Sequence, residues 1–66
     1  MEETYKIEFY KIRKKNYWVS LIIYGGKNNI PKLFESIVTH HNGISYHHGV
    51  VHKIEYVDGV IKCFLK

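Results

Sequence analysis

The dipeptide Asp58-Gly59 is the feature that most constrains how this chain folds, because it separates two runs in which apolar and polar residues alternate, Val50–Val57 and Val60–Leu65. Asp-Gly between such runs is the strongest short-range signal of a β-hairpin with a two-residue turn. This turn sets one pair of opposite charges and two apolar pairs across the hairpin: Glu55 with Lys62, Ile54 with Cys63, and Tyr56 with Ile61. Turn chemistry, charge and burial therefore agree on a hairpin at the carboxyl end.

A second hairpin is predicted at the amino-terminal end of the chain. Thr4–Arg13 alternates between apolar and charged residues, and Tyr17–Tyr24 is rich in aromatic and β-branched residues. Both patterns are typical of half-buried strands.

The loop of this first hairpin decides which residues face each other. A two-residue loop, Lys14-Lys15, sets Leu21 opposite Glu8, whereas a three-residue loop that adds Asn16 sets Leu21 opposite Phe9. The longer loop places apolar residues opposite apolar residues, and asparagine tolerates the left-handed conformation that such loops need. We therefore expect the three-residue loop.

The segment between the hairpins has the pattern of a helix with one buried face. Gly25-Gly26 ends the preceding strand, Asn28 or Asn29 is a favourable N-cap, and Pro31 falls in the first turn. Apolar residues follow at helical spacing: Ile30, Leu33, Phe34, Ile37 and Val38. Asn42-Gly43 is a helix stop signal. Residues 44–48 either extend the third strand or form a loop.

These elements predict an α+β domain spanning residues 1–66, with a four-stranded antiparallel sheet, one helix on one face, and the order β-β-α-β-β. The inner face of the sheet takes ten residues: Ile7, Phe9, Val19, Leu21, Ile23, Ile54, Tyr56, Ile61, Cys63 and Leu65. One helix covers only that side. The outer face keeps a second apolar set: Tyr10, Ile12, Trp18, Ile22, Tyr24, Val51, Val57, Val60 and Phe64. A contiguous exposed patch of this kind predicts an interface.

Cysteine usage and hydropathy indicate the compartment. Cys63 is the only cysteine, so the chain forms no internal disulfide, and a reducing cytoplasm, of the producing or the host cell, is expected. No apolar run approaches the ~18 residues of a membrane span. The acidic start at residues 1–4 does not fit a signal peptide. We therefore expect no membrane association.

The basic residues favour nucleic acid as the partner. The formal net charge is +4, and four cations cluster at the first hairpin loop. Cations neutralise phosphates and sheet-face aromatic rings stack bases. The candidate binding site comprises Lys6, Tyr10, Lys11, Arg13, Lys14, Lys15, Trp18, Ile22 and Tyr24. RNP, KH and zinc-finger signatures are absent.

A host protein is the alternative partner. A short basic chain without catalytic motifs is similar in kind to phage or mobile-element accessory proteins, which include inhibitors of the anti-CRISPR or anti-defence type. Such a protein would dock its apolar outer face, or a free edge strand, onto its target. A homodimer is also expected, because self-association commonly stabilises a thin core.

The sequence does not favour metal binding or catalysis. His48 and His52 share strand parity with the predicted core face, and His52 lies diagonal to Cys63, so three ligands could begin a zinc site. Adjacent histidine pairs point to opposite sides of a strand, however, and no CxxC motif is present. No paired carboxylates or nucleophile motif accompany the histidines. We predict a non-enzymatic binding protein with no cofactor and no small-molecule substrate.

Overall fold

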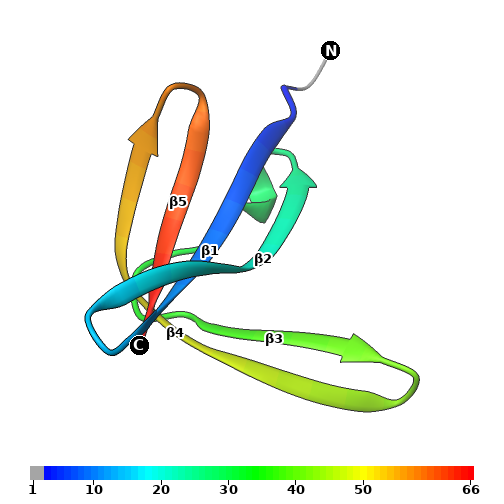
Figure 1. The fold of residues 1–66 in the computed structure, drawn as a ribbon. Coiled ribbons are helices and arrows are strands. Elements are labelled where there is room, and N and C mark those ends of the chain that lie inside the picture. The colour runs from blue at the N-terminus through cyan, green and yellow to red at the C-terminus, as the bar shows by residue number, and fades with distance from the viewer. Residues whose placement is uncertain (1–2) are drawn as a thin grey trace.

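Residues 3–66 are described by a computed structural model, in which five strands form one curled, mixed sheet (Figure 1). Its elements are β1 (Tyr5–Arg13), β2 (Asn16–Gly25), the short 3₁₀ turn η1 (Lys27–Asn29), β3 (Ser36–His41), β4 (Ile44–Val57) and β5 (Val60–Leu65). The strand order is β2-β1-β5-β4-β3. β1 and β5 are parallel and every other neighbouring pair is antiparallel. Met1 and Glu2, part of the acidic start, lie outside the described residues.

The predicted α+β class is wrong, since no α-helix occurs among residues 3–66. The predicted four-stranded antiparallel sheet is also wrong, since the sheet has five strands and β1 pairs parallel with β5. The predicted helical stripe, Ile30–Val38, instead forms an irregular loop followed by β3. Its apolar residues do not share one buried face, because Leu33 is 51% exposed and Phe34 is 79% exposed. Pro31 is buried after η1 rather than in a first helical turn.

Strand β3 forms where the helix was expected to end. The β-branched run Ile37-Val38-Thr39 favours an extended backbone. Asn42 and Gly43 have φ angles of 51° and 78°, so they form the tight turn of a β3–β4 hairpin and not a helix stop. As a strand, this segment pairs with β4, which also pairs with β5, so it joins the ladder of the sheet. Residues 44–48 extend the following strand, one of the two alternatives.

The carboxyl-terminal hairpin has the predicted register. Glu55 pairs with Lys62, and the two apolar pairs of the prediction, Ile54 with Cys63 and Tyr56 with Ile61, are present. The turn at Asp58-Gly59 has φ angles of 51° and 77°, as a type I′ turn requires. This part of the prediction is confirmed.

The first hairpin forms as expected, but its turn and the pairing next to the turn differ from the prediction. Arg13 pairs with Asn16, so the turn contains only Lys14 and Lys15, with φ angles of 50° and 70°. The three-residue loop is therefore wrong.

A β-bulge restores the expected pairing farther along this hairpin. Phe9 faces Leu21 as predicted, while Tyr10 faces Val19, which leaves Ser20 as the extra residue. The Ser20 hydroxyl donates to the Phe9 carbonyl oxygen at 3.4 Å. The bulge brings Leu21 back toward the core.

The same bulge exchanges two residues between the faces. Val19, predicted on the inner face, shares the outer face with Tyr10 and is 40% exposed. Trp18, predicted on the outer face, pairs with Lys11 and has the parity of the inner face.

A second bulge moves Val51 from the predicted outer face to the core. The ladder shifts between Val51, which pairs with Leu65, and Lys53, which pairs with Phe64. His52 is the extra residue. Val51, predicted on the outer face, is consequently fully buried.

The core lies inside the curl of the sheet. Its residues are Ile7, Phe9, Ile37, Val51, Ile61, Cys63 and Leu65, and five partly buried apolar residues pack against them: Tyr5, Leu21, Ile23, Ile30 and Ile54. Strand β5 contributes three core residues because it is central. The curl, with the loop that follows η1, covers this side in place of the predicted helix.

Strand β4 changes direction at Gly49. This residue has φ +142°, and a Cβ there would lie 3.1 Å from the Leu65 Cβ and 3.2 Å from the Lys66 carbonyl oxygen. Glycine is therefore required where β4 leaves the body of the sheet. The preceding part of β4 and β3 form a two-stranded projection, residues 36–48, here called the β3–β4 arm (Figure 1).

Candidate functional site

Three aromatic rings from different strands meet on the outer face. Tyr10 of β1 stacks on Phe64 of β5 with a centroid separation of 5.4 Å and an interplanar angle of 22°. Tyr17 of β2 meets Phe64 edge-on at 5.2 Å. Offset and edge-to-face contacts are favourable ring geometries. We call these three residues the aromatic cluster.

Two lysines cap the aromatic cluster. Lys62 Nζ lies 5.8 Å from the Tyr10 ring centroid, and Lys53 Nζ lies 5.7 Å from that of Phe64. Both distances are within the range of cation–π attraction. Lys53 also pairs with Glu55 at 3.0 Å. The cluster therefore combines one exposed ring, Tyr17, and two partly buried rings with nearby positive charge.

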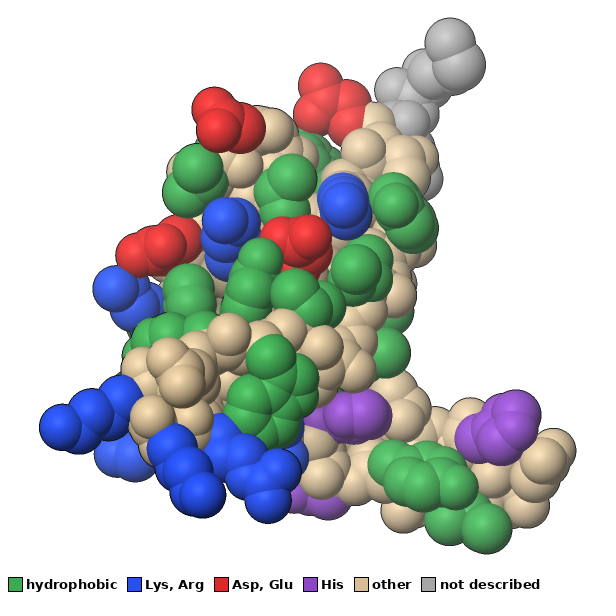
Figure 2. All heavy atoms as spheres, in the orientation of Figure 1, with side chains coloured by type: hydrophobic (Ala, Val, Ile, Leu, Met, Phe, Trp, Pro, Cys, Tyr) green, Lys and Arg blue, Asp and Glu red, His purple; other side chains and the backbone are tan. Residues whose placement is uncertain are grey.

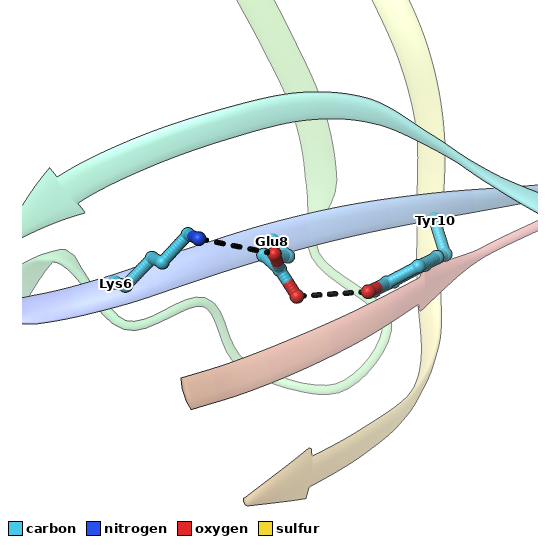
Figure 3. A network of polar contacts seen from close by, with 3 residues as sticks. All are labelled: Lys6, Glu8 and Tyr10. Carbon is cyan, nitrogen blue, oxygen red and sulfur yellow. Dashed lines mark hydrogen bonds and ion pairs between the residues drawn. The ribbon is translucent and has the colours of Figure 1, made fainter. Parts of the chain in front are cut away.

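A polar network runs along β1 beside the cluster (Figure 3). The Tyr10 hydroxyl donates to Glu8 Oε1 at 2.8 Å, and Lys6 Nζ lies 3.5 Å from Glu8 Oε2. The hydrogen bond to Glu8, together with burial, raises the pKa of Tyr10 above its ordinary value. Glu8 thus orients Tyr10 and offsets the charge of Lys6.

The turn of the first hairpin concentrates positive charge. Arg13, Lys14 and Lys15 are exposed there, and residues 9–34 contain no Asp or Glu. Arg13 Cζ lies 6.0 Å from the Trp18 ring centroid. Figure 2 shows Lys and Arg side chains gathered at this end of the molecule and Asp and Glu toward the opposite end. We call Arg13, Lys14 and Lys15 the basic tip.

The predicted site residues divide among three places. Lys6, Tyr10, Ile22 and Tyr24 lie on the outer face, where Ile22 is 44% exposed and Tyr24 68% exposed. The basic tip contains Arg13, Lys14 and Lys15. Lys11 and Trp18 lie beside the tip on the opposite side.

Four residues of this region were absent from the predicted site: Tyr17, Lys53, Lys62 and Phe64. The hairpin register already placed Phe64 on the outer face, and that signal could have included it. The placement of Tyr17 on the outer face depended on the bulge at Ser20. Proximity of Tyr10 to Lys62 depended on the parallel pairing of β1 with β5.

The residues considered for metal binding are not brought together. Cys63 is buried, His52 is exposed, and Nε2 of His48 lies 2.7 Å from the hydroxyl of Thr39. Residues 3–66 contain no group of three His, Cys, Asp or Glu side chains arranged to hold a metal ion.

Cys63 is fully buried, which lowers the accessibility of its thiol. Desolvation, followed by the nearby charge of Glu35, raises the pKa of the Cys63 thiol from 9.0 to about 11. Folding therefore favours the neutral thiol. The raised pKa contributes to the stability of the folded chain, and this stabilisation is complete below pH 9 and is lost as the pH rises through 11. We expect native Cys63 to resist iodoacetamide at about pH 8, because the thiolate is the nucleophile. Mass spectrometry measures the modified fraction.

The unfolded chain is the control for this experiment. In concentrated urea, Cys63 is exposed and should be alkylated rapidly. Equal rates for the native and unfolded chains would contradict the burial of this thiol.

The described part of the chain contains no helix with the length and apolar character needed to cross a bilayer. Comparison with protein-family models, curated proteins and solved structures finds no match.

Proposed function

We propose that this protein binds single-stranded nucleic acid, without catalysis, through the basic tip, the aromatic cluster and Trp18. Proteins that bind single strands combine cations that follow the phosphate backbone with rings that stack on bases. The basic tip supplies cations without acidic neighbours in sequence. Tyr17 and Trp18 are 51% and 41% exposed beside it and supply ring surface.

The observation that carries this proposal is the presence of lysine at both central positions of a type I′ turn. Lys14 and Lys15 have φ angles of 50° and 70°. A left-handed conformation costs about 1 kcal/mol or more for a residue other than glycine, and this turn normally contains Asn-Gly. Strained residues are commonly found at functional sites. A role for the two charges explains why lysines occupy unfavourable positions.

The rings extend the proposed surface on both sides of the hairpin. Tyr17 belongs to the aromatic cluster on the outer face, and Trp18 lies on the opposite side next to Arg13. Ile22 and Tyr24 continue the exposed outer surface along β2. A flexible single strand can follow this curved surface, whereas a rigid duplex cannot bring its bases against the rings.

Fluorescence anisotropy with a labelled oligothymidylate tests the proposal. We expect Trp18→Ala to weaken binding about tenfold, because one base–ring stack contributes about 1–3 kcal/mol. Tyr56→Ala is the matched control, since Tyr56 is also exposed, at 65%, but lies in β4 near the Asp58-Gly59 turn.

Salt and fluorescence give two further readouts in the same experiment. Wild-type affinity should fall steeply as salt rises, since phosphate contacts release counterions. Trp18 is the only tryptophan, so base stacking should quench its emission. Binding that is insensitive to both salt and Trp18→Ala would contradict the proposal.

Docking onto a host protein, in the manner of a phage or mobile-element inhibitor, is the second candidate function. Phe34 supports it, because this side chain is 79% exposed and its φ angle of 67° is unusual for a bulky residue. The Phe34 amide donates to the Val51 carbonyl oxygen at 2.7 Å, which holds the loop in place. An aromatic side chain held this way is suited to a pocket on a partner. A complex that survives nuclease and high salt favours this function.

A further inference from the structure

Beyond Ile37, which is buried in the core, the β3–β4 arm lacks the support that a two-stranded ribbon normally needs. It projects from the body of the sheet, and β3 has only β4 as a neighbour in the sheet (Figure 1). The radius of gyration is 12.1 Å, whereas about 10.8 Å is expected for a compact domain of this length. Two-stranded hairpins are at best marginally stable in water, and additional strands or a packed face stabilise them.

The chain exposes more surface than a compact monomer of its mass. The chain exposes 5214 Å². A folded monomer of 7.9 kDa is expected to expose about 4400 Å². The surplus of about 800 Å² equals one partner's share of an interface of standard size.

The composition of the arm is that of an interface. Residues 36–52 contain no Lys, Arg, Asp or Glu, although the arm is largely exposed. Figure 2 shows the arm with histidine and hydrophobic side chains and without Lys, Arg, Asp or Glu. Val38, Ile44 and Tyr46 are 41%, 55% and 48% exposed. Depletion of charge and enrichment of aromatic and apolar groups distinguish interface cores from ordinary surface.

Polar side chains of the arm pair with one another. His48 Nε2 lies 2.7 Å from the Thr39 hydroxyl oxygen, and His40 Nδ1 lies 2.9 Å from the Ser45 hydroxyl oxygen. Each hydrogen bond links β3 to β4 and gives two polar side chains of the arm a partner within the arm. Covering the arm therefore leaves fewer polar groups without partners, which lowers the cost of its desolvation.

The two edges of the sheet differ in their suitability for pairing. Strand β3 is an edge strand and has no proline and no charged residue. Proteins normally protect such an edge with these residues or with a bulge on its free side. The other edge strand, β2, has an extra residue at Ser20, which forms a bulge. It also begins beside the basic tip, so the like charges of two copies would repel each other if β2 paired with β2. β3 is therefore the edge open to pairing.

We propose that β3 pairs antiparallel with β3 of a second copy across a two-fold axis, forming an arm sheet in the order β4-β3-β3-β4. Two-fold pairing uses the same uncharged strand on both sides, so no complementary charge is needed and the assembly closes as a dimer. It gives each arm the extra strands that it lacks and occupies the open edge. The basic tips are not part of this interface, so the proposal is independent of the proposed function.

Matched substitutions on the two edges test this dimer. Val38 of β3 is 41% exposed and Val19 of β2 is 40% exposed. By analytical ultracentrifugation at about 100 μM, we expect the wild-type chain to have the mass of two chains. Val38→Lys should have the mass of one chain, since a lysine on an edge prevents edge-to-edge pairing. Val19→Lys should remain a dimer. Val38→Thr keeps β-propensity without charge and should remain a dimer.

Hydrogen exchange of the wild-type chain provides a readout that does not depend on any variant. Amide protection of residues 36–41 should increase as the protein concentration rises through the dissociation constant of the dimer. A wild-type monomer at 100 μM, or dissociation caused by Val19→Lys but not by Val38→Lys, would overturn the proposal. Protection of β3 that is independent of concentration would also overturn it.

Discussion

Replacing Phe9 by alanine is expected to leave most of the chain unfolded at 25 °C. Phe9 is 1% exposed at the centre of β1 and is the largest fully buried side chain. Truncating a buried phenylalanine costs about 3–5 kcal/mol, through lost burial and the cavity that remains. A core of this size supplies only about 3–5 kcal/mol of net stability, so the loss is comparable to the total. Circular dichroism during urea titration measures the change.

Phe34→Ala is the matched control for this substitution. Phe34 is 79% exposed, so its removal should change the free energy of unfolding by less than about 0.5 kcal/mol. Both variants are compared with wild type at one protein concentration, because dimerisation adds to apparent stability. A Phe9→Ala cost no larger than that of Phe34→Ala would show that the core lies elsewhere.

The second large effect is expected for the double substitution Lys14→Asn and Lys15→Gly, which should weaken nucleic-acid binding while stabilising the fold. Asn-Gly is the preferred sequence of a type I′ turn, so relief of left-handed strain should raise stability by about 1 kcal/mol. The substitution also removes two cations of the basic tip. Affinity and stability thus change in opposite directions, which excludes unfolding as the cause of weaker binding.

The size of the binding loss follows from counterion release. Each phosphate contact contributes about −0.7 to the slope of log affinity against log salt for a single strand. Loss of two contacts should reduce the slope by about 1.4 and weaken binding about 60-fold at 50 mM salt. Anisotropy titrations at several salt concentrations give both values, and thermal melting gives the stability.

A charge-matched control separates the basic tip from the net charge of the chain. Lys27→Gln with Lys32→Gln also removes two cations, but these lie in and after η1, away from the tip. This control should leave the salt slope nearly unchanged. An equal loss in both double variants would assign binding to overall charge and not to the tip.

The two hairpins with correctly predicted pairs illustrate what local sequence can show. Asp58-Gly59 marks a turn through the backbone preferences of two residues, and the opposite charges of Glu55 and Lys62 support one register. The same reasoning paired Phe9 with Leu21 but required an extra loop residue. The chain places that residue at Ser20, inside β2, because the position of a bulge depends on how both ends of the strand meet the core.

The helix prediction failed because one pattern is compatible with two structures. Ile37 and Val38 fit the buried stripe of a helix, yet they also belong to a β-branched run. Asn42-Gly43 ends a helix or turns a hairpin equally well. The presence of a partner strand in β4 decides between them, and a single-segment pattern contains no information about that partner.

Local sequence was enough to indicate the strand-forming runs at both ends, the tight turn at Asp58-Gly59 and the cluster of cations at Lys14-Lys15, because these depend on residues that are neighbours in the chain. Only the tertiary structure decided that β1 lies parallel to β5, that Phe64 therefore meets Tyr10, and that Trp18 and Val51 change faces. Those features arise from pairing between distant segments and from bulges that close the curl around Phe9, where burial of the whole core outweighs the preference of any one strand.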